Sequence, residues 1–580
     1  MQRTDARYKT PFCAVVGPMS PTIINPTILI IGGTGVFGRR LLTHLARFEN
    51  IAVVFSSRSL KKAEDLATRL RERHPSRQIR GIAMDHGQNL AEILVDLNPF
   101  AVIDCTGPFQ SADYNTAETI LKSGAHLIDL ADAREYLAAY HTHLDDTARK
   151  HKVVGLSGAS STPALSTCVV RDLTRNWQRI DTIDICITPG GKSEVGASVI
   201  AAIMSYAGAD IPTWRNGQLE TVSGWGQSKK ARITGLGERR VAPVETFDAE
   251  SHGPLFNVHA RVSFSAGLES QLEQWGMELI ARLRRQRLVP HPRYLIPLLL
   301  QLRKITRLFT SDQGAMQVDV SGIDASGHQA HAKWSLLAKQ DHGPFIPVLP
   351  AAAALRRLLE NSIPVGARTA DQALRLEDIQ NEWLPYDITA STQNAITQTS
   401  IFESVLKPPL FKQLPTSLQN FHSATGHPVW KGNADIENGK SMLARLVLRF
   451  MKLPHAGTDV PVTVAIERCI GPDGERSENW TRSFDQQTFS SVMKHNKNGD
   501  FTENFGLLSF SINLHSDRKS IKLPINRWHI GRLPLPLKMA PQLEAMEFED
   551  TQGRFNYDVK IKLPLVGMLV HYKGWLKPND

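Results

Sequence analysis

Thr27–Gly38, with the sequence TILIIGGTGVFG, is the stretch that decides the fold of the first part of this chain. Its apolar run, Ile28–Ile31, is typical of a parallel strand buried on both faces, and the residues after the glycines favour a helix. Gly33–Gly38 fits the pattern G-x-G-x-x-G, whose glycines permit a tight turn, close approach of a pyrophosphate and close helix–strand packing. Between a strand and a helix the pattern predicts a dinucleotide site, or alternatively a glycine-rich turn without a ligand.

Apolar strand-like runs continue to alternate with helical stretches up to residue 157. This alternation is typical of βαβ units, whose strands form a parallel, doubly wound sheet. We therefore expect an α/β fold in this region. The expected strands are 27–32, 51–56, 79–84, 101–105, 126–130 and 153–156.

The end of the second strand bears on the choice of cofactor. A site for NAD usually places Asp or Glu here, whereas this chain has Ser56–Ser59, SSRS, followed by Lys61 and Lys62. The guanidinium of Arg58 offers a fork of donors that suits a 2′-phosphate, so these residues favour NADP(H). The alternative is a solvated helix start. Asp85, after the third strand, lies near the adenine or serves as a cap or turn residue.

Five segments together resemble the saccharopine dehydrogenase-like family of NADP-binding oxidoreductases. They are GGTGVFG (32–38), SSRS (56–59), DCTGPF (104–109), GAHLIDLADAREY (124–136) and GASSTPALST (158–167). The resemblance implies a Rossmann-type sheet that binds NADP(H), with an inserted α+β domain for the substrate. The cofactor contacts expected in the turns are Gly33, Thr34, Gly35, Val36, Phe37, Gly38, Ser57, Arg58, Thr106, Gly107 and Pro108.

Polar residues follow the fifth and sixth strands at the rim where α/β sheets bind ligands. Asp129, Asp132 and Tyr136 are candidates for relaying a proton to a reduced carbonyl, or they cap and orient neighbouring turns. Ser160, Ser161 and Thr162 are candidates for binding substrate, or they form a helix cap before Pro163.

Changes in composition divide the chain further. We expect an extension over 1–24, the NADP-binding domain over 25–157, an α+β substrate domain over 158–330, a segment over 331–370 that returns to the first sheet, a polar linker over 371–405 and a β-rich domain over 406–580. The last resembles a C-terminal domain of unknown function that is often joined to such reductase-like domains. Its strands enclose an apolar ligand cavity or form a packed core.

The stretch 282–309 carries eight Lys or Arg residues and no acid, interspersed with apolar residues. A basic amphipathic helix of this kind lies on an anionic membrane surface. The alternative is a lid helix packed over the substrate pocket with its arginines outward.

The composition argues against several classes of function. The 580 residues, 42% of them hydrophobic and 21% charged, are typical of a folded protein. The net charge of +10 suits an anionic ligand or surface, but no nucleic-acid motif accompanies it. Five scattered cysteines argue against a disulfide framework or a metal site and favour the cytoplasm. The start of the chain lacks the apolar core of a signal peptide, and no stretch approaches a membrane span.

The leading interpretation is an NADPH-dependent reductase that transfers hydride to a C=O, C=N or activated C=C of a small-molecule or lipid-like substrate. One alternative is a non-catalytic NADP-binding scaffold or redox sensor whose C-terminal domain binds a lipid or a partner. Another is an amino-acid dehydrogenase of the saccharopine type, which requires arginines for the substrate carboxylates. A homodimer is left open by the sequence.

Overall fold

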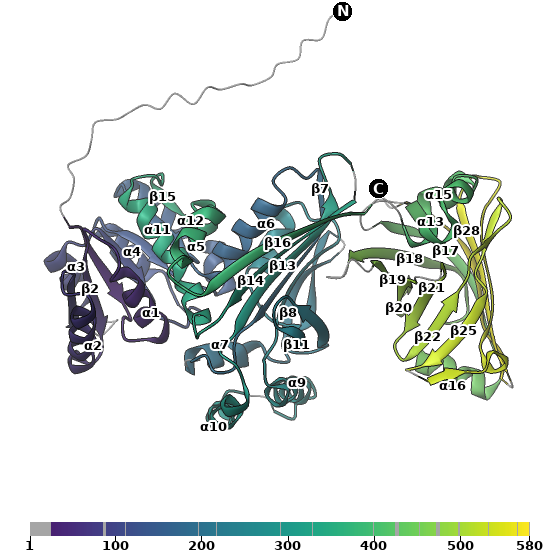
Figure 1. Ribbon diagram of the computed structural model, residues 1–580, viewed down its shortest axis with the longest axis horizontal. Coiled ribbons are helices and arrows are strands. Elements are labelled where there is room, and N and C mark those ends of the chain that lie inside the picture. The colour runs from purple at the N-terminus through teal and green to yellow at the C-terminus, as the bar shows by residue number, and fades with distance from the viewer. Residues whose placement is uncertain are drawn as a thin grey trace, which may run out of the picture.

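The apolar run of the glycine motif forms β1 (Thr27–Ile31), an inner strand of a seven-stranded parallel sheet in the computed structural model (Figure 1). The structure describes residues 25–84, 89–110, 112–194, 197–215, 217–289, 292–327, 329–397, 400–423, 428–451, 453–470, 476–485, 487–496, 499–531, 533–564 and 566–578. The strand order is β15-β6-β5-β4-β1-β2-β3. The other strands are β2 (Ala52–Ser57), β3 (Gln78–Ala83), β4 (Ala101–Asp104), β5 (His126–Asp129), β6 (Val154–Ser157) and β15 (Gly366–Thr369). The predicted doubly wound sheet is confirmed.

Both faces of this sheet are covered, which explains the continuous apolar run of β1. Ile28 and Ile30 belong to one cluster of core residues and Leu29 and Ile31 to the other, and all four are at most 1% exposed. The first cluster includes residues of α1 (Val36–Leu45), α2 (Leu60–Arg73), α11 (Leu349–Leu359) and α12 (Leu376–Trp383). The second includes residues of α3 (Leu90–Leu97), α4 (Asn115–Lys122) and α5 (Arg134–Lys150).

A second sheet of nine strands forms the middle of the molecule (Figure 1). Its main path is β10-β11-β12-β7-β13-β14-β16, and β8 and β9 form a hairpin beside β12. The strands are β7 (Arg179–Thr188), β8 (Asp210–Arg215), β9 (Gln218–Ser223), β10 (Lys229–Ile233), β11 (Gly237–Pro243), β12 (Arg261–Ala266), β13 (Gly314–Ile323), β14 (Gln329–Ala338) and β16 (Ile388–Thr397). The accompanying helices are α6 (Ser166–Leu173), α7 (Ala197–Tyr206), α8 (Asp248–Leu255), α9 (Gln271–Arg285) and α10 (Ile296–Thr306). The mixture of helices and strands fits the expected α+β domain, and β13 and β14 pair as an antiparallel hairpin.

The linker expected over 371–405 is wrong. These residues contain α12 and the ten-residue strand β16, which pairs antiparallel with β14 from Gln329↔Thr397 to Ala338↔Ile388. The polar composition arises because β16 is an edge strand with much of its length exposed to water. The return segment expected over 331–370 likewise begins with β14 of the second sheet before α11 and β15 rejoin the first.

The C-terminal domain is a curved antiparallel sheet of thirteen strands to one side of the first two sheets (Figure 1). Phe421 stacks on Phe555 at 3.8 Å inside it, and Trp430 and Trp480 complete this packed aromatic core. The helices are α13 (Ile401–Leu406), α14 (Pro408–Phe411), α15 (Thr416–Ser423) and α16 (Met442–Met451). The strands are β17 (Val429–Asn438), β18 (Gly457–Ile470), β19 (Arg476–Phe484), β20 (Gln487–His495), β21 (Phe501–Phe505), β22 (Leu508–Ile512), β23 (His515–Ser516), β24 (Ser520–Lys522), β25 (Ile525–Ile530), β26 (Leu533–Leu535), β27 (Gln542–Glu549), β28 (Phe555–Leu563) and β29 (Gly567–Pro578). Within the described residues, no helix is long and apolar enough to cross a membrane.

Candidate functional site

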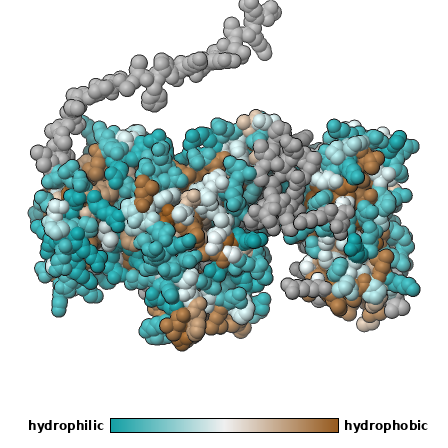
Figure 2. Space-filling view, in the orientation of Figure 1, coloured by the Kyte–Doolittle hydropathy of each residue, from teal (hydrophilic) through white to brown (hydrophobic). Residues whose placement is uncertain are grey.

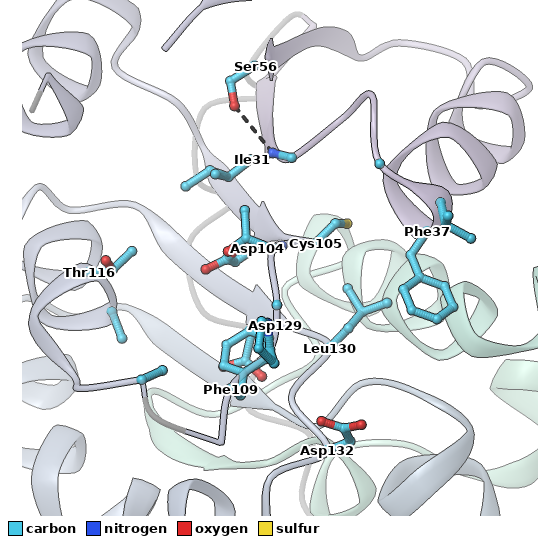
Figure 3. A pocket seen from close by; sticks show the side chains of 18 of the residues that line it. Ile31, Phe37, Ser56, Asp104, Cys105, Phe109, Thr116, Asp129, Leu130 and Asp132 are labelled. Carbon is cyan, nitrogen blue, oxygen red and sulfur yellow. Dashed lines mark hydrogen bonds between the residues drawn. The ribbon is translucent and has the colours of Figure 1, made fainter. Parts of the chain in front are cut away.

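A cavity of about 1040 Å³ opens at the carboxyl ends of β1, β2, β4 and β5 (Figure 3). The strand order reverses between β1 and β4, and α/β sheets bind ligands at such a switch point. The residues that line the cavity include most of the expected cofactor contacts: Thr34, Gly35, Val36, Phe37, Ser57, Arg58, Thr106, Gly107 and Pro108.

The glycine turn brings the start of α1 against the cavity. The Gly35 N–H donates to the carbonyl oxygen of Gly32 at 2.9 Å, which closes the turn. Gly33 and Gly38 are not among the lining residues, because they face protein. A Cβ at Gly38 would lie 2.3 Å from the oxygen of Gly32, and one at Gly33 would lie 2.7 Å from the side chain of Phe55. The turn therefore leaves the unpaired N–H groups of the helix start available to an anion.

The end of β2 presents hydroxyls and cations. The Ser57 hydroxyl oxygen accepts hydrogen bonds from Thr34 Oγ1 at 3.0 Å and from the Ser59 N–H at 3.2 Å. Ser59 also caps α2, because its side chain accepts a hydrogen bond from the Lys62 N–H. Arg58 and Lys62 are exposed and line the cavity. The donor set fits a phosphate group. Asp85 lies outside the described residues.

The turn after β4 is held by a residue that the sequence reasoning missed. Asp104 Oδ1 accepts hydrogen bonds from the Thr106 N–H at 2.8 Å and the Thr106 hydroxyl at 2.5 Å. Gly107 and Pro108 follow, and a Cβ at Gly107 would meet nothing within 4 Å, so this side of the cavity is open. The only signal in the sequence is that Asp104 ends an apolar strand directly before a Thr-Gly-Pro turn.

Asp129 is a buried carboxyl group in the cavity wall whose two oxygens differ in their hydrogen bonding. Its Oδ1 accepts hydrogen bonds from the Ser157 hydroxyl at 2.7 Å and from the N–H groups of Gly158 and Ala131, both at 3.0 Å. Its Oδ2 is buried and has no hydrogen-bond partner among the described residues. Burial raises the pKa of Asp129 to about 7. Figure 3 shows the side chain beside Phe109, below the end of β4.

The other proton-relay candidates differ in setting. Tyr136 lines the cavity, packs against Phe109 with ring centroids 5.3 Å apart and stacks on Tyr114 at 4.7 Å. Burial raises the pKa of Tyr136, so its hydroxyl stays protonated at neutral pH. Asp132 lies at the exposed mouth and accepts a hydrogen bond from Gln110 Nε2 at 3.3 Å. The three candidates thus share one cavity.

The hydroxyl-rich loop does not join them. Ser160, Ser161 and Thr162 are not among the residues that line the cavity, and the Ser160 side chain does not cap a helix. The chain here enters a short helix, Ser161–Leu165, whose residues Pro163–Leu165 are buried, so the segment turns into the core. The second domain instead contributes Ala202, from α7, to the cavity wall.

Comparison with known proteins gives one family match and several similar folds. Residues 414–576 match a family described as a domain of unknown function, DUF4166, which confirms the prediction of such a domain at the C-terminal end. No curated protein matches the chain. A saccharopine dehydrogenase (L-Glu forming) from Saccharomyces cerevisiae matches with 13% identity and a TM-score of 0.44, covering 64% of this chain and 100% of its own.

Two further solved structures show smaller similarity. A meso-dapdh mutant from Clostridium tetani, in complex with DAP, has 12% identity and a TM-score of 0.32, covering 61% of this chain and 96% of its own. GenD2 from gentamicin A biosynthesis, in complex with NAD, has 13% identity and a TM-score of 0.26, covering 44% of this chain and 68% of its own.

Proposed function

We propose that this protein is an NADP(H)-dependent oxidoreductase that reduces a C=O, C=N or activated C=C. The observation that carries the proposal is the cavity itself. One space of about 1040 Å³ is lined by the glycine turn, by Ser57 and Arg58 after β2, and by the buried carboxyl of Asp129 after β5. Donors for a dinucleotide and a group able to hold a proton near neutral pH therefore face the same volume.

Each end of the cavity suits a different part of the cofactor. The start of α1 and the turn from Thr34 to Phe37 would hold the pyrophosphate. Arg58, Lys62 and the Ser57 hydroxyl would hold a 2′-phosphate, because their positive charge and donors match its oxygens. The open turn at Gly107 and Pro108 would hold the nicotinamide end. A bound nicotinamide supplies the hydride chemistry.

Asp129 is the residue that we assign to proton transfer. A reduced carbonyl or imine must take up a proton, and a carboxyl with a pKa near 7 exchanges one readily at physiological pH. The unpartnered Oδ2 is the atom that is free to do so, because Oδ1 is held by three donors. Phe109 and Tyr136 supply an apolar wall that limits water near this oxygen.

The cofactor assignment is tested with Arg58→Ala and the control Lys61→Ala. Lys61 is an exposed cation on the same helix start, but it is not among the lining residues. Titration of nucleotide fluorescence should show that Arg58→Ala raises the Kd for NADPH by about tenfold or more and leaves that for NADH unchanged. The control should change neither. Equal losses for the two nucleotides would contradict the 2′-phosphate assignment.

The catalytic assignment is tested with Asp129→Asn, which keeps an acceptor for Ser157, Gly158 and Ala131 and removes the titrating proton. NADPH oxidation is followed with a panel of enones, ketones and imines. We expect kcat to fall by about 100-fold with NADPH affinity retained. NADPH binding by the wild type without consumption on any substrate would favour the scaffold alternative.

A further inference from the structure

The lower edge of the middle domain carries a continuous apolar surface. It is formed by α9, by α10 and by the short helix η3 (Arg307–Phe309), and we call it the α9–η3 surface. Figure 1 shows the two helices projecting from the sheets, and Figure 2 shows hydrophobic side chains gathered there. The large apolar side chains more than half exposed on this surface and its connecting segment are Leu272, Trp275, Leu279, Leu288, Tyr294, Leu298, Ile305, Leu308 and Phe309.

Exposure on this scale is not typical of a surface that faces only water. Leu308 and Phe309 are 76% and 86% exposed and adjacent, while Trp275 and Leu279 lie one turn apart on the outer face of α9. The buried residues of α9, including Met277 and Ile280, occupy its other face, so the outer stripe is additional to the one that packs. Contiguous exposed apolar patches mark interaction sites.

Two arginines of this region, Arg284 and Arg303, do not point outward as a lid helix would require. Arg303 donates to the carbonyl oxygens of Gly191 and Ser193 and pairs with Glu273 at 3.2 Å. Arg284 donates to the carbonyls of Ser205 and Ala207 at 2.8 and 2.9 Å. These guanidinium groups point inward and hold the helices in place. The apolar side chains therefore point outward.

Other cations remain at the rim of the apolar surface. Arg282, Arg287 and Lys304 are exposed, and their side chains have no ion-pair partner among the described residues. The stretch 282–309 contains no acid, so its local charge is strongly positive. An apolar centre with a rim of lysine and arginine is complementary to a bilayer, whose interior is apolar and whose anionic headgroups are negative.

We propose that the α9–η3 surface docks this protein onto an anionic phospholipid membrane. The apolar side chains of α9, α10 and η3 enter the boundary between headgroups and acyl chains, and Arg282, Arg287 and Lys304 contact the headgroups. A second copy of this chain fits the surface less well. Pairing the surface with itself would bring two rims of the same charge together, which is unfavourable.

The docked surface adjoins α7, which contributes Ala202 to the wall of the cofactor cavity. Arg284 binds the carbonyls at the end of α7, Arg303 binds those of the loop before it, and Ala202 of α7 lines the cavity. A molecule that leaves the membrane at this surface is thus close to the cavity wall. The substrate class that this arrangement favours is a membrane lipid, an extension that rests on the proposed oxidoreductase function.

Docking is tested with the full-length protein by flotation on phosphatidylcholine vesicles with and without about 30% phosphatidylserine. We expect binding to the anionic vesicles, with partitioning reduced about tenfold by Phe309→Glu and severalfold by Lys304→Glu. Val95→Glu and Lys150→Glu are matched controls, because both residues are exposed on helices of the first domain. The controls should bind as the wild type does.

Several outcomes would overturn the docking proposal. They are absence of binding, equal binding to neutral vesicles, equal losses in variants and controls, or a wild-type dimer that Phe309→Glu dissociates. NADPH titration of the same variants tests the cofactor site independently, so a failure of either proposal is distinguishable.

The lipid-substrate extension is tested with vesicles that carry long-chain enones or ketones. NADPH consumption by the wild type that Phe309→Glu abolishes supports it, whereas equal consumption by both proteins, or none, overturns it.

Discussion

Gly38→Ala tests how closely α1 packs on the glycine turn. The added methyl carbon would lie 2.3 Å from the carbonyl oxygen of Gly32, 2.7 Å from Gly33 Cα and 2.9 Å from the carbonyl carbon of Gly32. All three are backbone atoms, so no side chain can rotate away. The helix must therefore shift by roughly 1 Å from the end of β1, since real contacts of this kind need more than about 3 Å.

The expected loss of stability follows from this shift. Overpacking by one methyl group destabilises a core by about 3 kcal/mol, and the better helix propensity of alanine returns about 1 kcal/mol. The net destabilisation of about 2 kcal/mol corresponds to a Tm lower by about 4–8 °C for a cooperative unit of this size. Thermal unfolding followed by calorimetry measures it.

Gly35→Ala is the matched control for this change. Its added carbon would meet only the oxygen of Gly32, at 3.1 Å, and Gly35 has a φ of −71° that alanine adopts freely. Because Gly35 lines the cavity, we expect NADPH affinity to fall by about tenfold while the Tm changes by less than about 3 °C. A Gly38→Ala protein with the wild-type Tm would refute the close packing of α1 on the turn.

Three further substitutions test the cofactor end of β2, a buried carboxyl group and a buried hydrogen bond. Ser57→Asp places a carboxylate at the end of β2, so NADPH should bind about tenfold more weakly and NADH more tightly in fluorescence titrations. Asp248 is fully buried, and burial raises its pKa to about 7. Its contribution to the free energy of unfolding is therefore present below about pH 4 and is lost as the pH rises through about 7. Denaturant unfolding at several pH values should show that Asp248→Asn removes up to about 4 kcal/mol of this pH dependence. His44→Ala removes the hydrogen bond at 2.8 Å between His44 and the buried Glu382, which keeps its ion pair with Arg356 at 2.6 Å. It should destabilise the fold by about 2 kcal/mol in thermal unfolding.

The first domain was predictable because each of its inner strands is buried on both faces. Continuous apolar runs such as Ile28–Ile31, separated by helical stretches, indicate parallel strands buried on both faces. The glycine pattern marks where the first strand ends. The edge strand β16 was missed for the opposite reason. Between Ile388 and Ile396 it has no large apolar side chain, so only the pairing with β14 distinguishes it from a linker.

The candidate site was predictable in part. Thr34, Gly35, Ser57, Arg58 and Gly107 meet in one cavity because the carboxyl ends of parallel strands share an edge of the sheet. The loop at Ser160–Thr162 carries the same kind of polar residues but turns into the core, and a sequence pattern does not encode that direction.

The sequence by itself determined the strand–helix alternation, the glycine turn and the cationic end of β2, because these depend on residues close together in the chain. Tertiary structure alone decided which oxygen of Asp129 is held and which is unpartnered, since its donors Ser157 and Gly158 come from a different strand end. It also decided that Arg284 and Arg303 point inward, whereas Trp275 and Leu279 point outward. Amphipathic periodicity separates two faces of a helix, but the elements packed against it determine which face meets water.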